Sequence, residues 1–156
     1  MALEVTEKIM GIDYGDARIG IAISDPFGWT AQVWGQLPNI RGPIHAAREI
    51  VSVMQQYKIQ KIVMGYPLNM NGTRGQAVEK VEEFIRQLAK LSPVPVIRWD
   101  ERLSTVSAQR TLTETGIKSK MKKNRIDGMA AQVILQSYLD NRSMQSEIKG
   151  GMENET

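Results

Sequence analysis

The sequence contains no cysteine and only one histidine, His45. Without cysteine the chain can form neither disulfides nor thiolate metal sites, and a Cys–His nucleophile is excluded. His45 lies at the start of an amphipathic segment, where we expect a surface position, so a Ser–His nucleophile is not expected either. No apolar run approaches the roughly 20 residues that a membrane-spanning helix needs. The first eight residues lack the basic-then-apolar order of a signal peptide, and we therefore expect a cytoplasmic protein without membrane contact.

The chain has 156 residues, of which 42% are hydrophobic and 24% are charged. This length is sufficient for one domain with a sizeable core, and the composition is typical of globular proteins. No internal repeat or linker divides the sequence. We expect a single domain over residues 1–140, followed by a polar, flexible tail over residues 141–156.

The net charge of +3 is unevenly distributed along the chain. The segment "KSKMKKNR", residues 118–125, contains five basic residues and no acid, so the other residues together carry −2. A local basic patch of this kind suits an anionic polymer such as a nucleic acid. The alternative interpretation is an ordinary solvated loop.

Hydrophobic patterning predicts an α/β chain. Strands are expected over residues 9–13, 18–24, 30–37, 61–67 and 94–101, and helices over 43–57, 78–88, 104–116 and 126–140. Three strands in a meander, followed by two strands joined through helices, predict a five-stranded mixed sheet flanked by helices. The expected strand order is 3-2-1-4-5.

Acidic residues follow two of the predicted parallel strands, and ligands bind beyond the carboxyl ends of such strands. Asp13 ends the first strand and Glu101 ends the fifth, so that the two side chains can approach each other across the fourth strand. Asp127 begins the last helix, on the side of the helix that we expect to pack against the rest of the protein. Three carboxylates at one sheet edge repel one another unless a divalent cation neutralises them, and oxygen ligands favour Mg²⁺ or Mn²⁺.

Each acid also has a structural interpretation. Asp13 can begin a turn, and Asp127 can be an N-terminal helix acid favoured by the helix dipole. Asp100 and Glu101 can form ion pairs with neighbouring arginines, Arg98 and Arg102. Because alternation places Asp100 and Glu101 on opposite faces of their strand, Asp100 remains an alternative to Glu101 as the second metal ligand.

Divalent metal held by carboxylates beside a basic segment is typical of phosphodiester hydrolysis. Four segments, read in order, then resemble the YqgF/RuvX family of the RNase H-like superfamily: "GIDYGDARIGIAISDP", "GYPLNMNGTRG", "WDERLST" and "KKNRIDGMAAQVILQSYLD". The resemblance extends from about Ile9 to Asp140. It implies an RNase H-like fold with catalytic, metal-binding acids at Asp13, Glu101 and Asp127.

Members of this family are described as Holliday junction resolvases and as nucleases that mature the 5′ end of the bacterial 16S rRNA precursor. The resemblance therefore implies a metal-dependent nuclease acting on pre-16S rRNA, with branched DNA as the alternative substrate. A resolvase is expected to be a symmetric homodimer, whereas an RNA-trimming enzyme need not be one, so the sequence leaves both a monomer and a homodimer open.

Several polar residues near the predicted sheet edge are candidates for contact with nucleic acid. Arg18 lies in the first hairpin, and its alternative role is an ion pair with an acid. Ordinary turn chemistry explains the polar residues after the fourth strand equally well. The complete set of candidates is Arg18, Asn69, Asn71, Thr73, Arg102, Lys118, Lys120, Lys122, Lys123 and Arg125.

Two functions of other classes remain open at the sequence level. Actin-type and sugar-kinase-type ATPases also have a D-x-G motif before a hairpin, which leaves a nucleotide-binding module as one alternative. A non-catalytic nucleic-acid-binding protein with the same fold and basic segment is the other.

Overall fold

The computed structural model describes residues 7–103 and 128–148. A short 3-10 turn, η2 (Glu101–Leu103), follows the last strand. The predicted helix over 104–116 lies outside the described residues. The strands and longer helices, in chain order, are β1 (Ile9–Tyr14), β2 (Arg18–Ser24), β3 (Ala31–Pro38), α1 (Pro43–Tyr57), β4 (Lys61–Tyr66), α2 (Gln76–Leu91), β5 (Val96–Asp100) and α5 (Met129–Ile148).

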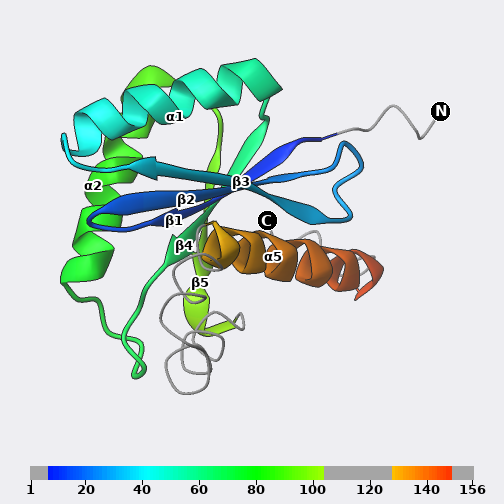
Figure 1. Ribbon diagram of the computed structural model, residues 1–156. Coiled ribbons are helices and arrows are strands. Elements are labelled where there is room, and N and C mark those ends of the chain that lie inside the picture. Colours follow the sequence, from blue (N-terminus) through cyan, green and yellow to red (C-terminus); the bar gives the residue numbers. More distant parts are fainter. Residues whose placement is uncertain (1–6, 104–127, 149–156) are drawn as a thin grey trace, which may run out of the picture.

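The five strands form one mixed sheet in the order β3-β2-β1-β4-β5, as the sequence predicts. β1 pairs antiparallel with β2 and parallel with β4, and β5 pairs parallel with β4. The carboxyl ends of β1, β4 and β5 therefore share one edge of the sheet. The loop after β4 leads from this edge into α2 (Figure 1).

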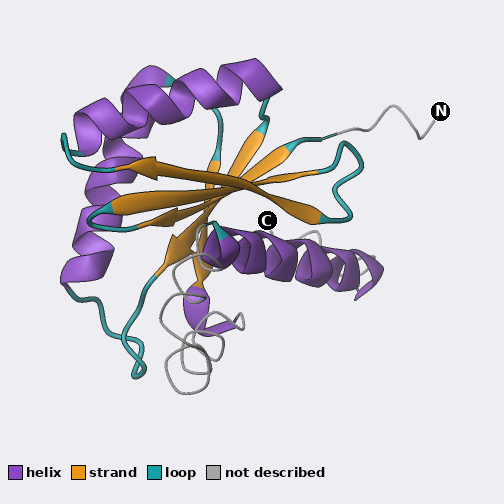
Figure 2. Cartoon of the chain, viewed as in Figure 1, coloured by secondary structure: helices purple, strands orange, loops and turns teal. Residues whose placement is uncertain are grey.

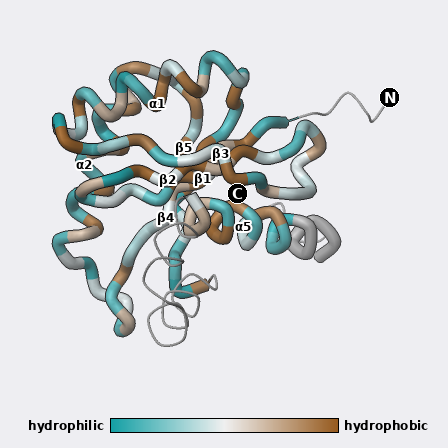
Figure 3. The backbone as a smooth tube through the Cα atoms, viewed as in Figure 1, coloured by the Kyte–Doolittle hydropathy of each residue, from teal (hydrophilic) through white to brown (hydrophobic). Residues whose placement is uncertain are grey.

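Side chains of β1 alternate between two cores on opposite faces of the sheet. Met10 and Ile12 pack with residues of α1 and α2, whereas Ile9 packs with Ile134 and Leu135 of α5. Figures 1 and 2 show α1 and α2 over one face and α5 over the other. In Figure 3 hydrophobic residues follow the strands at the centre of the molecule. Burial on both faces explains why β1 and β4 have nearly continuous apolar sequences.

Glycines let α5 approach the sheet closely. A Cβ atom on Gly11 of β1 would lie 2.7 Å from Cβ of Leu135. A Cβ atom on Gly20 of β2 would lie 3.4 Å from Cα of Gly128, the residue before α5. Gly20 is the cross-strand partner of Asp13, so the beginning of α5 lies above the end of β1.

The helix α5 continues past the boundary at residue 140 that the sequence led us to expect. The residues from Asn141 to Ile148 are mostly polar but include neither glycine nor proline, and Gly150 and Gly151 follow. A polar composition does not by itself end a helix, whereas glycine disfavours one. Among the described residues, no helix is both long and apolar enough to cross a lipid bilayer.

Candidate active site

A cavity of about 450 Å³ lies at the sheet edge where β1 and β4 end. It contains two of the three acids predicted to bind metal, Asp13 and Glu101. The full lining is Asp13, Tyr14, Gly15, Asp16, Pro67, Gln76, Ala77, Lys80 and Glu101. Residues from β1, the β1–β2 turn, the loop after β4, α2 and η2 thus converge on one space.

The register of β1 determines the position of Asp13. Alternation places Asp13 on the same face as Ile9 and Gly11, which is the face covered by α5. The next residue, Tyr14, points to the opposite face and stacks on Phe84 of α2, with ring centroids 4.4 Å apart. Tyr14 therefore fixes the strand end from which the Asp13 carboxylate projects.

Glu101 reaches the cavity by crossing β4. It follows the last residue of β5, opens the turn η2 and is only 9% exposed. A Cβ atom on Gly65 of β4 would lie 2.7 Å from Oε2 of Glu101, so the carboxylate lies directly above this glycine. β4 separates β5 from β1, and Glu101 consequently extends from the end of β5 across β4 toward Asp13 on β1. The sequence contains a signal for this contact, because a glycine inside a buried strand often indicates that another group approaches the strand backbone closely.

Asp100 has a different environment from Glu101. Its carboxylate accepts hydrogen bonds from the backbone N–H and the guanidinium of Arg102, with the Nη2 donor at 2.7 Å. The hydrogen bonds from Arg102 hold the pKa of Asp100 below its usual range. Arg102 also donates to the carbonyl of Met70 at 3.1 Å and so connects η2 to the loop after β4. Both residues thus have contacts that organise the loop beside the cavity.

The other described candidates for nucleic-acid contact lie near the same edge. Asn69, Asn71 and Thr73 are exposed and hydrogen-bond to one another, with Nδ2 of Asn69 at 2.8 Å from Oγ1 of Thr73. These contacts are those of an ordered turn. The sequence left open both this role and contact with nucleic acid. Arg18 is exposed at the start of β2, where its carbonyl accepts from the N–H of Gly15.

The remaining predicted site residues lie outside the described ranges. Within residues 7–103 and 128–148, no three Asp, Glu or His side chains are grouped closely enough to hold a metal ion. The predicted residues that lie outside are Asp127, Lys118, Lys120, Lys122, Lys123 and Arg125.

Sequence reasoning missed two charged residues of the cavity, Lys80 and Asp16. Nζ of Lys80 on α2 donates to Oδ1 of Asp16, in the β1–β2 turn, at 2.9 Å. The two residues are 64 positions apart, and Lys80 lies on the polar face of an amphipathic helix. No local pattern distinguishes it from other solvated lysines.

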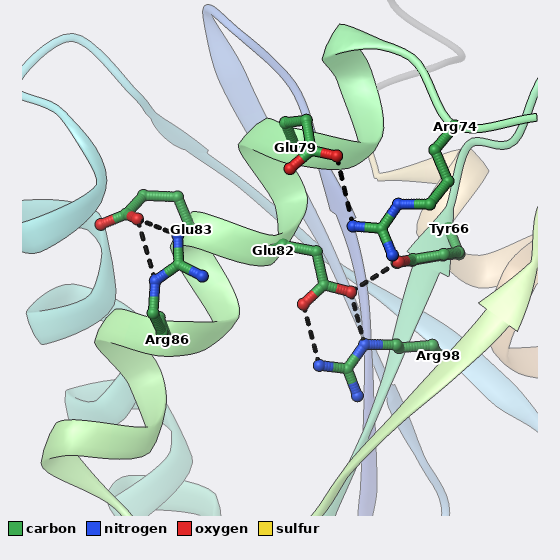
Figure 4. A network of polar contacts seen from close by, with 7 residues as sticks. All are labelled: Tyr66, Arg74, Glu79, Glu82, Glu83, Arg86 and Arg98. Atoms are coloured by element: carbon green, nitrogen blue, oxygen red, sulfur yellow. Dashed lines mark hydrogen bonds and ion pairs between the residues drawn. The ribbon is translucent and has the colours of Figure 1, made fainter.

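A polar network fixes α2 beside the sheet (Figure 4). Arg98 of β5 donates to both carboxylate oxygens of Glu82, from Nε at 2.7 Å and Nη2 at 2.9 Å. The Tyr66 hydroxyl donates to the same carboxylate at 2.6 Å. Hydrogen bonds from Arg98 are the main reason that the pKa of Glu82 falls to about 2. Burial, with the hydrogen bond to Glu82, raises the pKa of Tyr66.

The donor set of the cavity is compatible with a hard divalent cation. Asp13 supplies carboxylate oxygens from β1 and Glu101 supplies them from the turn η2, and these are the ligands that Mg²⁺ and Mn²⁺ prefer. The register of β1 and the close approach at Gly65 limit how far either side chain can move. Carboxylates whose movement is restricted at one sheet edge are suited to holding an ion and a phosphate in fixed relative positions.

Comparison with known proteins finds relatives that match most of this chain. A relative from Ruminiclostridium cellulolyticum named "Putative pre-16S rRNA nuclease" is 50% identical over 133 residues, covering 85% of this chain and 94% of the relative. A protein of the same name from Acetivibrio thermocellus is 46% identical over 139 residues, covering 86% and 96%.

Solved structures share the fold at low sequence identity. RuvC of T. thermophilus in complex with a Holliday junction substrate has a TM-score of 0.58 at 13% identity, over 88% of this chain and 96% of RuvC. The α/β fold is therefore RNase H-like, as the resemblance implied. The family model described as "RuvX: Holliday junction resolvase" matches residues 7–141, and the chain belongs to the RuvX family.

Proposed function

We propose that this chain is a metal-dependent nuclease that hydrolyses phosphodiester bonds during 5′-end maturation of pre-16S rRNA in the cytoplasm. The observation that carries the proposal is the pair of carboxylates, Asp13 and Glu101, that line one cavity at the sheet edge. The names of the relatives at 50% and 46% identity support pre-16S rRNA as the substrate.

In this proposal Asp13, Glu101 and Asp127 bind Mg²⁺ or Mn²⁺. Asp127 is included because it precedes Gly128, which packs against Gly20, the cross-strand partner of Asp13. Asp127 itself lies outside the described residues, and its role is the one that the family resemblance implies.

A divalent cation supplies Lewis-acid activation of water and offsets charge on the phosphate. The protein's own contribution is positioning: Asp13 is fixed by strand register, and Glu101 is fixed by its contact with Gly65. The basic residues of the 118–125 segment attract the substrate backbone, which supplies affinity without sequence information.

A second substrate, branched DNA, is favoured by the family description and by the similarity of the fold to RuvC. The two substrates are distinguished by incubating the purified protein and Mg²⁺ with an RNA spanning the 5′ end of 16S rRNA and, separately, with a four-way DNA junction. We expect cleavage of the RNA by a monomer. Symmetric double cleavage of the junction by a dimer would favour the resolvase, and cleavage of neither substrate would contradict nuclease activity.

Asp100 and Glu101, which are adjacent in the sequence, provide a matched test of the catalytic assignment. Asp13→Asn and Glu101→Gln should each lower the cleavage rate by more than about 100-fold, because each removes a metal ligand. Asp100→Asn removes a neighbouring carboxylate that is held by Arg102, and it should retain most of the activity. Rates at saturating Mg²⁺, with urea unfolding to verify the fold, provide the measurement. Activity lost in Asp100→Asn but kept in Glu101→Gln would show that Asp100 is the ligand.

A further inference from the structure

Lys80 is the cationic residue in the cavity that contains Asp13 and Glu101. Among the described residues that line the cavity, three carry carboxylates, Asp13, Asp16 and Glu101, and Lys80 alone carries an ammonium group. A phosphodiester that approaches these carboxylates is repelled, whereas the ammonium group attracts it. Lys80 therefore has the charge and the position to receive a phosphate at the mouth of the cavity.

The fold does not depend on the ion pair between Lys80 and Asp16. The side chains are 53% and 76% exposed, and exposed ion pairs contribute little to stability. The buried residues of α2, which include Phe84 and Leu88, already fix the helix, and Glu82 adds its bond to Arg98. The pair can therefore open at little cost to the fold.

Lys80 is held more loosely than the arginine at the same edge. Arg102 is bound by both carboxylate oxygens of Asp100 and by the carbonyl of Met70. The structure gives Lys80 one hydrogen bond, to Asp16, on a long flexible side chain. A lysine ammonium group is also an established type of phosphate ligand, acting as a point charge.

We propose that Lys80 exchanges its bond with Asp16 for a bond with a backbone phosphate of the substrate strand. Asp16 holds the ammonium group at the cavity mouth when substrate is absent, and the phosphate replaces the Asp16 carboxylate on binding. This inference rests on the proposed nuclease function and adds a substrate-contacting residue to it.

The first test is binding of a short fluorescein-labelled single-stranded RNA, followed by anisotropy across a KCl series in EDTA. Lys80→Gln should weaken binding about tenfold, because one charge-assisted hydrogen bond is lost. The slope of log K against log salt should fall by about 0.7, the value for one phosphate contact on a single strand. Lys80→Arg should restore the slope, and Asp16→Asn should bind as tightly as wild type or more tightly.

The matched control is Lys90→Gln, which removes the same charge from an exposed position on the same helix, outside the cavity. It should leave affinity and slope unchanged. In the cleavage reaction with Mg²⁺, Lys80→Gln should raise KM about tenfold and change kcat less than threefold, which separates substrate contact from structural damage.

Two outcomes overturn the inference while leaving the proposed function intact. One is an unchanged salt slope in Lys80→Gln when the wild-type protein binds and cuts RNA. The other is an equal loss of affinity in Lys90→Gln, which would indicate a general charge effect. A wild-type protein that neither binds nor cuts RNA overturns the proposed function, and with it the role of Lys80.

Discussion

Gly65 is the residue that leaves space for the Glu101 carboxylate above β4. A Cβ atom at this position would lie 2.7 Å from Oε2 of Glu101 and 2.7 Å from Cδ1 of Ile134. Carbon and oxygen atoms do not pack at this distance, so any side chain must displace one of these neighbours. The absence of a side chain at residue 65 is therefore part of the geometry of the cavity.

Gly65→Ala should destabilise the protein by about 1–3 kcal/mol, because it overpacks a closely packed site. Glu101→Asp, whose side chain is shorter by one methylene, should relieve the clash, so that the alanine costs less in that background. Urea unfolding of both single variants and the double variant measures this coupling. Strictly additive destabilisation would mean that Gly65 and Glu101 do not constrain each other.

At the residue scale, local sequence patterns predicted some positions of the cavity and not others. Asp13 and Glu101 end apolar runs, and the strand order places both at one sheet edge, where they line the same cavity. Their catalytic roles remain predictions. Lys80 and Asp16 were not predicted, because their contact joins a turn to a helix 64 positions away. The turn η2 places Glu101 at the cavity, and short-range alternation does not specify this turn.

At the scale of elements, α2 is joined to two strands by a single carboxylate. Glu82 accepts hydrogen bonds from Tyr66 of β4 and from Arg98 of β5 (Figure 4). These contacts lower the pKa of Glu82 from 4.5 to about 2. A shift of this size corresponds to about 3 kcal/mol, and solvent screening at the partly exposed Arg98 reduces the contribution to about 1–2 kcal/mol.

Glu82→Gln should therefore lower the free energy of unfolding at pH 7 by about 1–2 kcal/mol. The folded-state pKa lies below the unfolded value, so the contribution of Glu82 is complete above about pH 4.5 and is lost as the pH falls toward 2. Urea unfolding of the wild type and the variant across this range should show a difference that narrows with acidity. A difference that stays constant with pH would argue against the pKa shift of Glu82.

Glu83→Gln is the matched control for this experiment. Glu83 is the neighbouring acid on the same helix, but its partners, Arg86 and Gln87, belong to that helix and not to a strand. Its removal should change stability much less than Glu82→Gln does. Equal effects of the two variants would show that the loss arises from helix charge and not from the junction between α2 and the sheet.

The predicted elements agree with the structure where apolar periodicity is strong. The strands β1, β2 and β4 are buried on both faces, and α1 and α2 have clear apolar stripes. Prediction was weaker at ends that depend on tertiary contacts. The helix α5 continues beyond residue 140, where polarity was mistaken for the end of the helix. Likewise, β5 ends at Asp100, so that Glu101 belongs to a turn.

At the scale of the whole molecule, basic charge is concentrated in one segment. Residues 118–125 carry +5, and because the whole chain carries +3, the rest of the protein is net acidic. An RNA is thus attracted by one short region of the sequence and repelled on average by the remainder. The cavity itself contains three carboxylates, so a phosphodiester is repelled there unless cations, metal ions or basic side chains, offset their charge.

Replacing Lys120, Lys122 and Lys123 together by alanine should weaken binding to every nucleic acid by a similar factor, because phosphate contacts carry charge and not sequence information. The salt slope should fall by up to roughly 0.9 per lost contact on duplex and 0.7 on a single strand. Anisotropy titrations with RNA and with a four-way DNA junction across a salt series provide the measurement. Mg²⁺ affinity, measured by calorimetry, should not change, since these lysines offer no oxygen ligand.

The control for the triple variant is a protein with Arg48→Ala and Lys90→Ala, which removes positive charge from exposed positions on α1 and α2. It should keep the wild-type salt slope, because a charge that does not contact phosphate releases no counterions from the nucleic acid. If the control and the triple variant reduce the slope equally per charge removed, the basic segment acts only through net charge. If the slope is unchanged in the triple variant, the substrate binds elsewhere, and Lys80, the cationic residue among the described lining of the cavity, becomes the first candidate for the phosphate contact.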